Sequence, residues 1–183
     1  MTRKELDQFL NFLDLHDCWI FTIQTAEVYF QETPNTLRHS LSRHVQSKAI
    51  TRLARGLYAN LHSKTKPLYA LEDMIRFLRP SHISYLSLES RLSELGVISQ
   101  VPTRLTMMTA GRSQIYNTPL GTIEFTHTKR EVSEYSGFIK YDRKRNILIA
   151  SPKIALEDLG NSKRNLGLVD SHEYDLAQKE WKA

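Results

Sequence analysis

The segment from Thr33 to Leu71 contains no aspartate or glutamate, although arginine and lysine recur along it. Within it, Leu37, Leu41 and Val45 recur at every fourth position, which is the spacing of one face of an amphipathic helix. A disordered tail of like charges lacks such apolar periodicity. The segment is therefore expected to fold and to present a basic surface suited to phosphates.

The N-terminal part of the chain predicts three helices followed by a β-hairpin. The expected elements are helices over residues 3–14, 22–31 and 34–46, strands over 49–53 and 57–59, and a turn over 54–56. Thr33 fits the N-cap of the third helix, and Pro34 fits its first position, where a missing N–H costs nothing. Three helices followed by a basic hairpin are the arrangement of a winged helix-turn-helix DNA-binding domain, whose third helix enters the major groove.

The third helix supplies the candidate DNA contacts. At about 100° per residue, its apolar residues point inward and its hydrogen-bonding residues point outward. We predict contacts in the groove by Asn35, His39, Ser42, Arg43 and Gln46. We predict phosphate contacts by Arg38, Lys48, Arg52 and Arg55. The alternative is an exposed polar face with no role in DNA binding.

A further helix over residues 67–78 ends at Arg79-Pro80-Ser81, where we place a domain boundary. Residues 1–80 then form the DNA-binding domain with a linker helix, and residues 81–183 form a second domain. The second domain is predicted to be α+β, with a small and mostly antiparallel sheet. Its expected helices cover residues 87–95 and 152–159 and start near 170, and its expected strands cover 103–109, 114–117, 122–128, 137–141 and 146–150. Ser87 is the expected N-cap of the first of these helices.

The bulk properties agree with two small domains and a nucleic-acid partner. The chain has 183 residues, a net charge of +5 and a pI of about 9.3. The single cysteine, Cys18, excludes an intrachain disulfide, and its neighbours Trp19 and Ile20 suggest a place in the core. No signal-peptide pattern and no run of about 20 apolar residues occurs, so we expect a cytoplasmic protein without a membrane partner.

The sequence contains no pattern of an enzyme, a metal site or a cofactor site. The histidines show no HExxH spacing, and the glycines are single and scattered, which excludes a Gly-rich phosphate loop. A nuclease motif would need an acid followed two residues later by Lys on a strand, but Glu124 is followed by Phe125-Thr126. We therefore expect no catalytic activity, no metal and no cofactor.

Five segments, in order and spacing, are similar to those of a known family. They are residues 50–59 (ITRLARGLYA), 85–96 (YLSLESRLSELG), 109–112 (TAGR), 118–125 (TPLGTIEF) and 149–159 (IASPKIALEDL). From about residue 20 to 170 the chain resembles the AbiEi antitoxins of type IV toxin–antitoxin systems, which act in abortive infection and phage defence. It differs from that family at Ala110, where the family pattern has a second Thr.

The resemblance implies a protein with two activities. Its N-terminal winged helix would repress its own operon by binding repeats in the double-stranded promoter DNA. Its C-terminal domain would counteract a toxin that is similar to GTP-dependent nucleotidyltransferases, without an obligatory stable complex.

The candidate antitoxin surface comes from charged residues of the second half. It comprises Glu89, Arg112, Lys140, Arg143, Lys144 and Arg145. Arg112 offers a rigid fork of donors for an anionic group, or it is a loop arginine held by an acid such as Glu89. The basic residues from 140 to 145 form a phosphate-contacting patch, a face for an acidic toxin, or a solvated turn.

Two other functions remain open at this point. One is a protein-interaction module that binds the toxin directly and does not bind DNA. The other is a winged-helix transcription regulator whose C-terminal domain senses a ligand. A nucleotidyltransferase-like gene next to this one would argue against the regulator.

Overall fold

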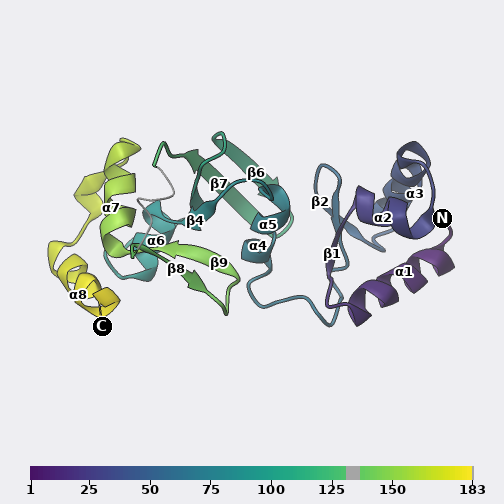
Figure 1. Ribbon diagram of the computed structural model, residues 1–183, viewed down its shortest axis with the longest axis horizontal. Helices are drawn as coiled ribbons and strands as arrows, with labels where there is room; N and C mark the ends of the chain where they lie inside the picture. The colour runs from purple at the N-terminus through teal and green to yellow at the C-terminus, as the bar shows by residue number, and fades with distance from the viewer. Residues whose placement is uncertain (131–136, 183) are drawn as a thin grey trace. The chain divides into compact units, whose positions relative to one another are not determined.

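The computed structural model describes residues 1–130 and 137–182 and shows an α+β protein. By its internal contacts the chain divides into two compact units (Figure 1). The first comprises Met1–Ala70 with Thr118–Leu120, and the second comprises Leu71–Asn117 and the part that begins at Gly121. Compactness does not show which part folds independently, so the domain boundary at residue 80 stays a prediction.

The first unit contains three helices and a small antiparallel sheet, drawn in purple to blue in Figure 1. Its elements are α1 (Arg3–Leu15), β1 (Ile20–Thr22), α2 (Ile23–Phe30), α3 (Pro34–Gln46), β2 (Thr51–Ala54) and β3 (Leu57–Ala59). The sheet has the order β1-β3-β2, with both pairings antiparallel. The three predicted helices and the predicted hairpin are confirmed. Sequence patterns missed β1, because its three residues run directly into the apolar start of α2.

Local side-chain contacts explain where these helices begin. Thr2 and Glu5 form a reciprocal capping box at the start of α1, in which the Thr2 N–H donates to Glu5 Oε2 at 2.6 Å. Thr33 Oγ1 accepts a bond from the Thr36 N–H at 3.4 Å, which confirms Thr33 as the N-cap of α3. The helices then pack around a core in which Phe9 meets Phe21 edge-on, with 5.0 Å between the ring centres.

The hairpin of β2 and β3 turns at Gly56, which has φ of +73°. This left-handed geometry strains any residue with a side chain, although a Cβ there would meet open space. The register shifts between Arg52 and Ala54, so β2 carries a bulge just before the turn. Tyr58 of β3 stacks on Phe21 and joins the hairpin to the core.

Cys18 does not lie in the core, and that prediction is wrong. Its side chain is exposed, and its thiol donates to the carbonyl of His16 at 3.3 Å. The chain turns sharply at Asp17, where φ is +54°, directly after the end of α1. Trp19, which is 1 % exposed, takes the buried position that the local pattern suggested for Cys18.

The second unit is built on a six-stranded mixed sheet, drawn in teal to yellow-green in Figure 1. Its strands are β4 (Ser84–Leu86), β5 (Leu105–Thr109), β6 (Gln114–Thr118), β7 (Gly121–His127), β8 (Ile139–Asp142) and β9 (Ile147–Ala150). Its helices are α4 (Ala70–Asp73), α5 (Ile75–Leu78), α6 (Leu88–Glu94), α7 (Pro152–Asn161) and α8 (Ser171–Lys182), with a 3-10 turn over Leu166–Leu168.

The small, mostly antiparallel sheet predicted for this half is a larger, mixed one. The order is β6-β7-β5-β4-β9-β8, in which β4 pairs in parallel with β9, and β5 pairs in parallel with β7. Sequence patterns did not predict the three residues of β4, which pairs with β5 on one side and with β9 on the other. The helix predicted over residues 67–78 is also divided into α4 and α5 at Met74, whose carbonyl accepts the N–H groups of Phe77 and Leu78.

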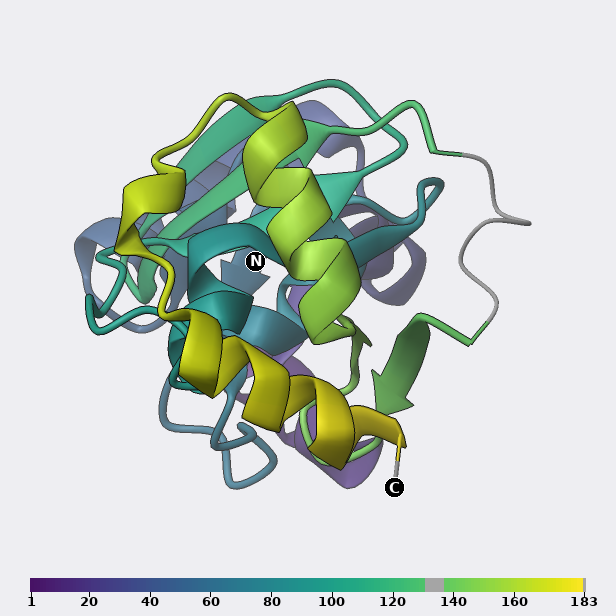
Figure 2. The same ribbon diagram turned by 90° about the vertical axis from the view of Figure 1, so that its left-hand side faces the viewer.

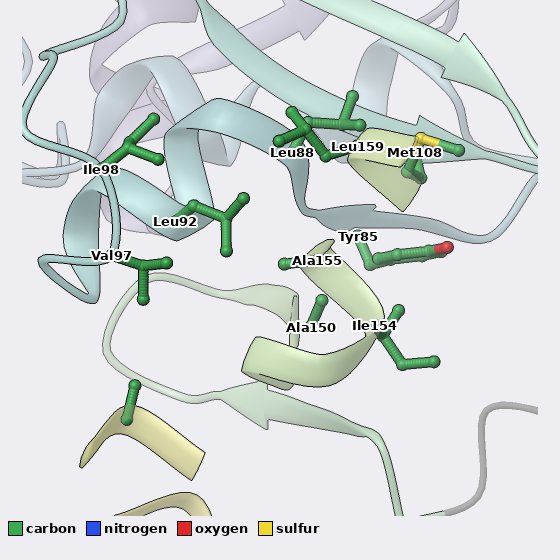
Figure 3. Packing of buried hydrophobic residues seen from close by; sticks show 11 residues of the cluster. Tyr85, Leu88, Leu92, Val97, Ile98, Met108, Ala150, Ile154, Ala155 and Leu159 are labelled. Atoms are coloured by element: carbon green, nitrogen blue, oxygen red, sulfur yellow. The ribbon is translucent and has the colours of Figure 1, made fainter. Parts of the chain in front are cut away.

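The core of the second unit lies between the sheet and α6, α7 and α8. Figure 2 shows α7 and α8 on the same side of the sheet, and Figure 3 shows the apolar side chains packed there. Leu88, Leu92 and Leu159 of this cluster are at most 1 % exposed. Within the described residues, no helix combines the length and the apolar character needed to cross a membrane.

Candidate nucleic-acid interface

All nine residues predicted to contact DNA have exposed side chains. Six lie on α3, Lys48 follows α3, Arg52 lies in β2, and Arg55 lies in the turn of the hairpin. On the opposite side of α3, Leu37 and Leu41 are fully buried, so the helix has the predicted orientation. Whether the exposed side chains touch DNA stays a prediction.

The cations of this surface are not neutralised by carboxylates of the protein. Among the described residues, none of the following has an ion-pair partner: Arg38, Arg43, Lys48, Arg52 and Arg55. In the second unit, by contrast, many arginines lie within 3.3 Å of a carboxylate oxygen, namely Arg76, Arg91, Arg104, Arg130, Arg145 and Arg164. The positive charge of α3 and the hairpin therefore remains available to an external anion.

Several of these side chains are held by neutral partners. Arg38 Nη1 donates to Asn35 Oδ1 at 2.9 Å, and Arg43 Nη2 donates to Ser40 Oγ at 3.3 Å. Arg52 Nε donates to the carbonyl of Ala54 at 3.3 Å, across the bulge of β2. Such bonds orient a guanidinium and leave its charge intact, which lowers the entropy lost when an anion binds.

The inner side of α3 contains two polar residues that sequence patterns did not identify as buried. Ser40 is 3 % exposed and His44 is 9 % exposed. Burial lowers the pKa of His44, so its ring is neutral at pH 7. His44 therefore belongs to the supporting side of the helix, and the positive charge of the surface comes from arginine and lysine.

Two residues of the candidate antitoxin surface are engaged within the second unit. Arg145 lies 2.6 Å from Glu72 and 2.8 Å from Glu94, and it ties the β8–β9 turn to α4 and α6. Glu89 receives both of its bonds from Arg164 Nη1, at 2.9 and 3.0 Å. Arg112 is therefore not the cation that holds Glu89. These contacts stabilise the unit and leave neither side chain ready for a partner.

The other four candidate residues are exposed, and three of them lie close together in the chain. Lys140 of β8 donates to the carbonyl of Trp181 at 3.0 Å, and Arg143 and Lys144 are exposed in the turn that follows. Arg112 is exposed in the loop after β5, where its carbonyl accepts a bond from Arg79. Of the six candidates, two are thus engaged in internal ion pairs and four have exposed side chains.

A buried polar cluster centred on Asp158 was not predicted from the sequence. Asp158 is 1 % exposed and accepts bonds from Ser87 Oγ at 2.7 Å, Tyr85 Oη at 3.0 Å and Arg130 Nη2 at 3.3 Å. Ser87 is the N-cap residue of α6, as expected, but its hydroxyl donates to Asp158 and makes no capping bond. No local pattern connects residues so distant in the chain.

We expect the buried Asp158 carboxyl to make the free energy of unfolding depend on pH. Burial raises its pKa above the ordinary 3.8, against the opposite effect of its hydrogen bonds and of Arg130. The folded state then binds the proton more tightly than the unfolded state does. The contribution of the Asp158 carboxyl to the free energy of unfolding is therefore fully present below pH 3.8. It is lost as the pH rises through the raised pKa of the folded state.

Urea unfolding of the wild type and of Asp158→Asn at a series of pH values measures this effect. The free energy of unfolding of the wild type, relative to the variant, should fall as the pH rises through that window. A difference that is constant, or that increases with pH, would contradict the assignment.

The chain matches no protein-family model, and no curated protein matches it. The resemblance to AbiEi antitoxins therefore stays a hypothesis that depends on the five segments. The physical case for a function depends on the surface of the first unit.

Proposed function

We propose that the first unit is a winged helix-turn-helix domain that binds double-stranded DNA. The observation that supports this most directly is a set of five cations on α3, at Lys48 and in the hairpin, none of which has a carboxylate partner among the described residues. An unpaired cluster of this kind attracts a polyanion, and duplex DNA carries one negative charge per about 1.7 Å of its axis.

The order and the shape of the elements support the same proposal. The chain runs α1-β1-α2-α3-β2-β3, so that a helix with a polar outer face is followed by a hairpin with Arg52 in its first strand and Arg55 in its turn. The major groove admits one α-helix, and a hairpin next to it reaches the phosphate backbone. Asn35, His39 and Gln46 supply donors and acceptors for base edges, as Asn and Gln do for adenine.

Replacing Arg43 by alanine tests whether α3 reads bases. Arg43 is exposed in the last turn of α3, and a bidentate contact to guanine contributes about 1 to 3 kcal/mol. Titration of promoter DNA should show affinity weakened by about five- to a hundredfold, with relaxed preference at one base pair. Equal weakening on all sequences would make Arg43 a phosphate contact.

Arg112→Ala is the matched control for this experiment, because Arg112 is an exposed arginine of the second unit. It should bind promoter DNA like the wild type. If Arg43→Ala and the control bind equally well, α3 does not contact the DNA.

We also propose, on the strength of the five similar segments alone, that the protein represses its own promoter through repeats and counteracts a nucleotidyltransferase-like toxin. The DNA surface is confined to the first unit, so Arg43→Ala should still protect cells that express the toxin. Loss of protection together with loss of DNA binding would instead tie the two activities to one surface.

A further inference from the structure

A cavity of about 400 Å³ in the second unit has aromatic walls. Phe138 lies just before β8, and Tyr174 and Trp181 lie on α8. The rest of the lining comes from Lys153, near the start of α7, and from Gly137, Ser151 and Gln178. Figure 2 shows the C-terminal end of α8, in yellow, beside strand β8, in green.

Cations stand over the rings of this cavity. Lys140 Nζ lies 4.4 Å from the ring centre of Trp181, and Lys153 Nζ lies 5.2 Å from that of Phe138. Lys153 forms a loose ion pair, at 3.9 Å from Glu157, and its side chain is 53 % exposed. Lys153 lines the aromatic cavity and Lys140 lies over the ring of Trp181, so both ammonium groups are positioned to meet an anion near these rings.

The turn after β8 extends the positive charge away from the cavity. Arg143 and Lys144 are exposed there, three and four residues after Lys140. Neither side chain has an ion-pair partner among the described residues, whereas the neighbouring Arg145 is bound to Glu72. Arg143 and Lys144 thus offer two further positive charges for phosphates, beyond the cavity.

We propose that this surface binds an unpaired segment of RNA, with one base in the aromatic cavity and its phosphates on the cations. Proteins that bind single-stranded nucleic acid combine aromatic platforms for bases with a basic track for the backbone. Unpaired RNA presents such splayed bases, which stack on aromatic rings. The inference concerns the second unit and does not depend on DNA binding by α3.

The character of the walls favours an unpaired nucleic-acid strand over an acidic protein segment or a duplex. The carboxylates of an acidic protein segment would bind the cations but would supply no aromatic group to pack against the rings of the cavity. A nucleic-acid duplex has stacked bases that cannot enter a cavity. The Trp181 N–H is also buried without a hydrogen-bond partner among the described residues, and a base offers ring nitrogen and carbonyl acceptors to such a donor.

The full-length protein can be titrated with a fluorescein-labelled oligouridylate of about ten nucleotides, a length within the span of single-strand sites. Anisotropy should report binding, and the fluorescence of Trp181 should be quenched by the bound base. The other tryptophan, Trp19, is 1 % exposed and unable to stack on a ligand. Phe138→Ala should weaken binding by about five- to a hundredfold, the range for loss of one base–aromatic contact.

Matched variants distinguish this site from general attraction to a basic protein. Phe12→Ala removes an equally exposed ring of the first unit, since Phe12 is 41 % and Phe138 is 38 % exposed. Lys153→Gln and Lys163→Gln each remove one exposed lysine of the second unit, and only Lys153 lines the cavity. Phe12→Ala and Lys163→Gln should bind like the wild type, and Lys153→Gln should bind more weakly.

Several results would overturn the proposal. They are absence of Trp181 quenching, equal binding by Phe138→Ala and Phe12→Ala, and full competition by duplex RNA of the same length. Equal affinity for oligothymidylate would overturn the assignment to RNA, and displacement of the RNA by polyglutamate at equal charge would favour an acidic protein partner.

Discussion

Replacing Arg145 by alanine should lower the free energy of unfolding by about 3 kcal/mol, because it leaves the Glu72 carboxylate without its cation, whereas Glu94 keeps Arg91 at 3.3 Å. Arg145 forms two hydrogen bonds to Glu72, at 2.6 and 2.8 Å, and one to Glu94 at 3.0 Å. Burial works to lower the pKa of Arg145, but these bonds outweigh burial and raise it. The side chain of Glu72 is 10 % exposed, so water can replace little of the lost interaction.

The value of about 3 kcal/mol lies at the lower end for a broken buried ion pair, since Glu94 is 33 % exposed and keeps part of its hydration. Urea unfolding followed by far-UV circular dichroism measures the change. Arg145→Lys should be intermediate, because an ammonium keeps the charge but cannot bind Glu72 with a planar fork. Arg143→Ala and Lys144→Ala, which remove exposed neighbours, should change the free energy by at most about 0.5 kcal/mol.

If Arg145→Ala were as stable as these neighbouring variants, the network would not stabilise the unit. Arg145 would then return to the set of residues that an external partner contacts. The experiment thus decides between an internal and an external role for one of the six candidate antitoxin residues.

Sequence patterns predicted the first unit well because its signals are local. The helix from Pro34 to Gln46 follows from a cap at Thr33 and from apolar residues one turn apart, all within a short stretch of chain. The exposed face of that helix follows from the same periodicity. A candidate surface that lies on one helix and one hairpin can therefore be identified before the structure is known.

The second unit was less predictable because its structure depends on distant contacts. Strand β4 has only three residues, too few for an alternating pattern, yet it pairs with both β5 and β9. The contacts of Arg145 also depend on residues that are distant in the chain. The sequence places Arg145 in a run of basic residues, but only the fold brings Glu72 next to it and removes it from the surface.

The aromatic cavity illustrates why the proposed RNA site was not found from the sequence. Phe138, Lys153 and Trp181 come from the start of β8, from α7 and from the end of α8, with no motif spacing between them. The basic turn beside it was visible, but its aromatic partners were not. A specific function can be proposed for exposed basic residues only when their neighbours in space are known.

Affinity for promoter DNA should fall about 500-fold when the salt concentration is raised from 50 to 200 mM, if the five unpaired cations of the first unit each neutralise a phosphate. Each phosphate contact contributes about −0.9 to the slope of log affinity against log salt, so five contacts give about −4.5. A gel-shift or anisotropy titration at several salt concentrations measures the slope.

The slope also tests individual residues. A variant that lacks one phosphate contact should have a slope about 0.9 smaller in magnitude, so its affinity should fall only about 150-fold between 50 and 200 mM salt. Arg55→Ala is the sharpest choice, since Arg55 lies in the turn of the hairpin, exposed and without an ion-pair partner among the described residues. Lys163→Ala, which removes an exposed lysine of the second unit, should leave the slope unchanged.

A flat salt response of the wild type would remove the electrostatic basis of the proposed DNA interface. A steep response that both variants share equally would place the contacts elsewhere on the basic chain.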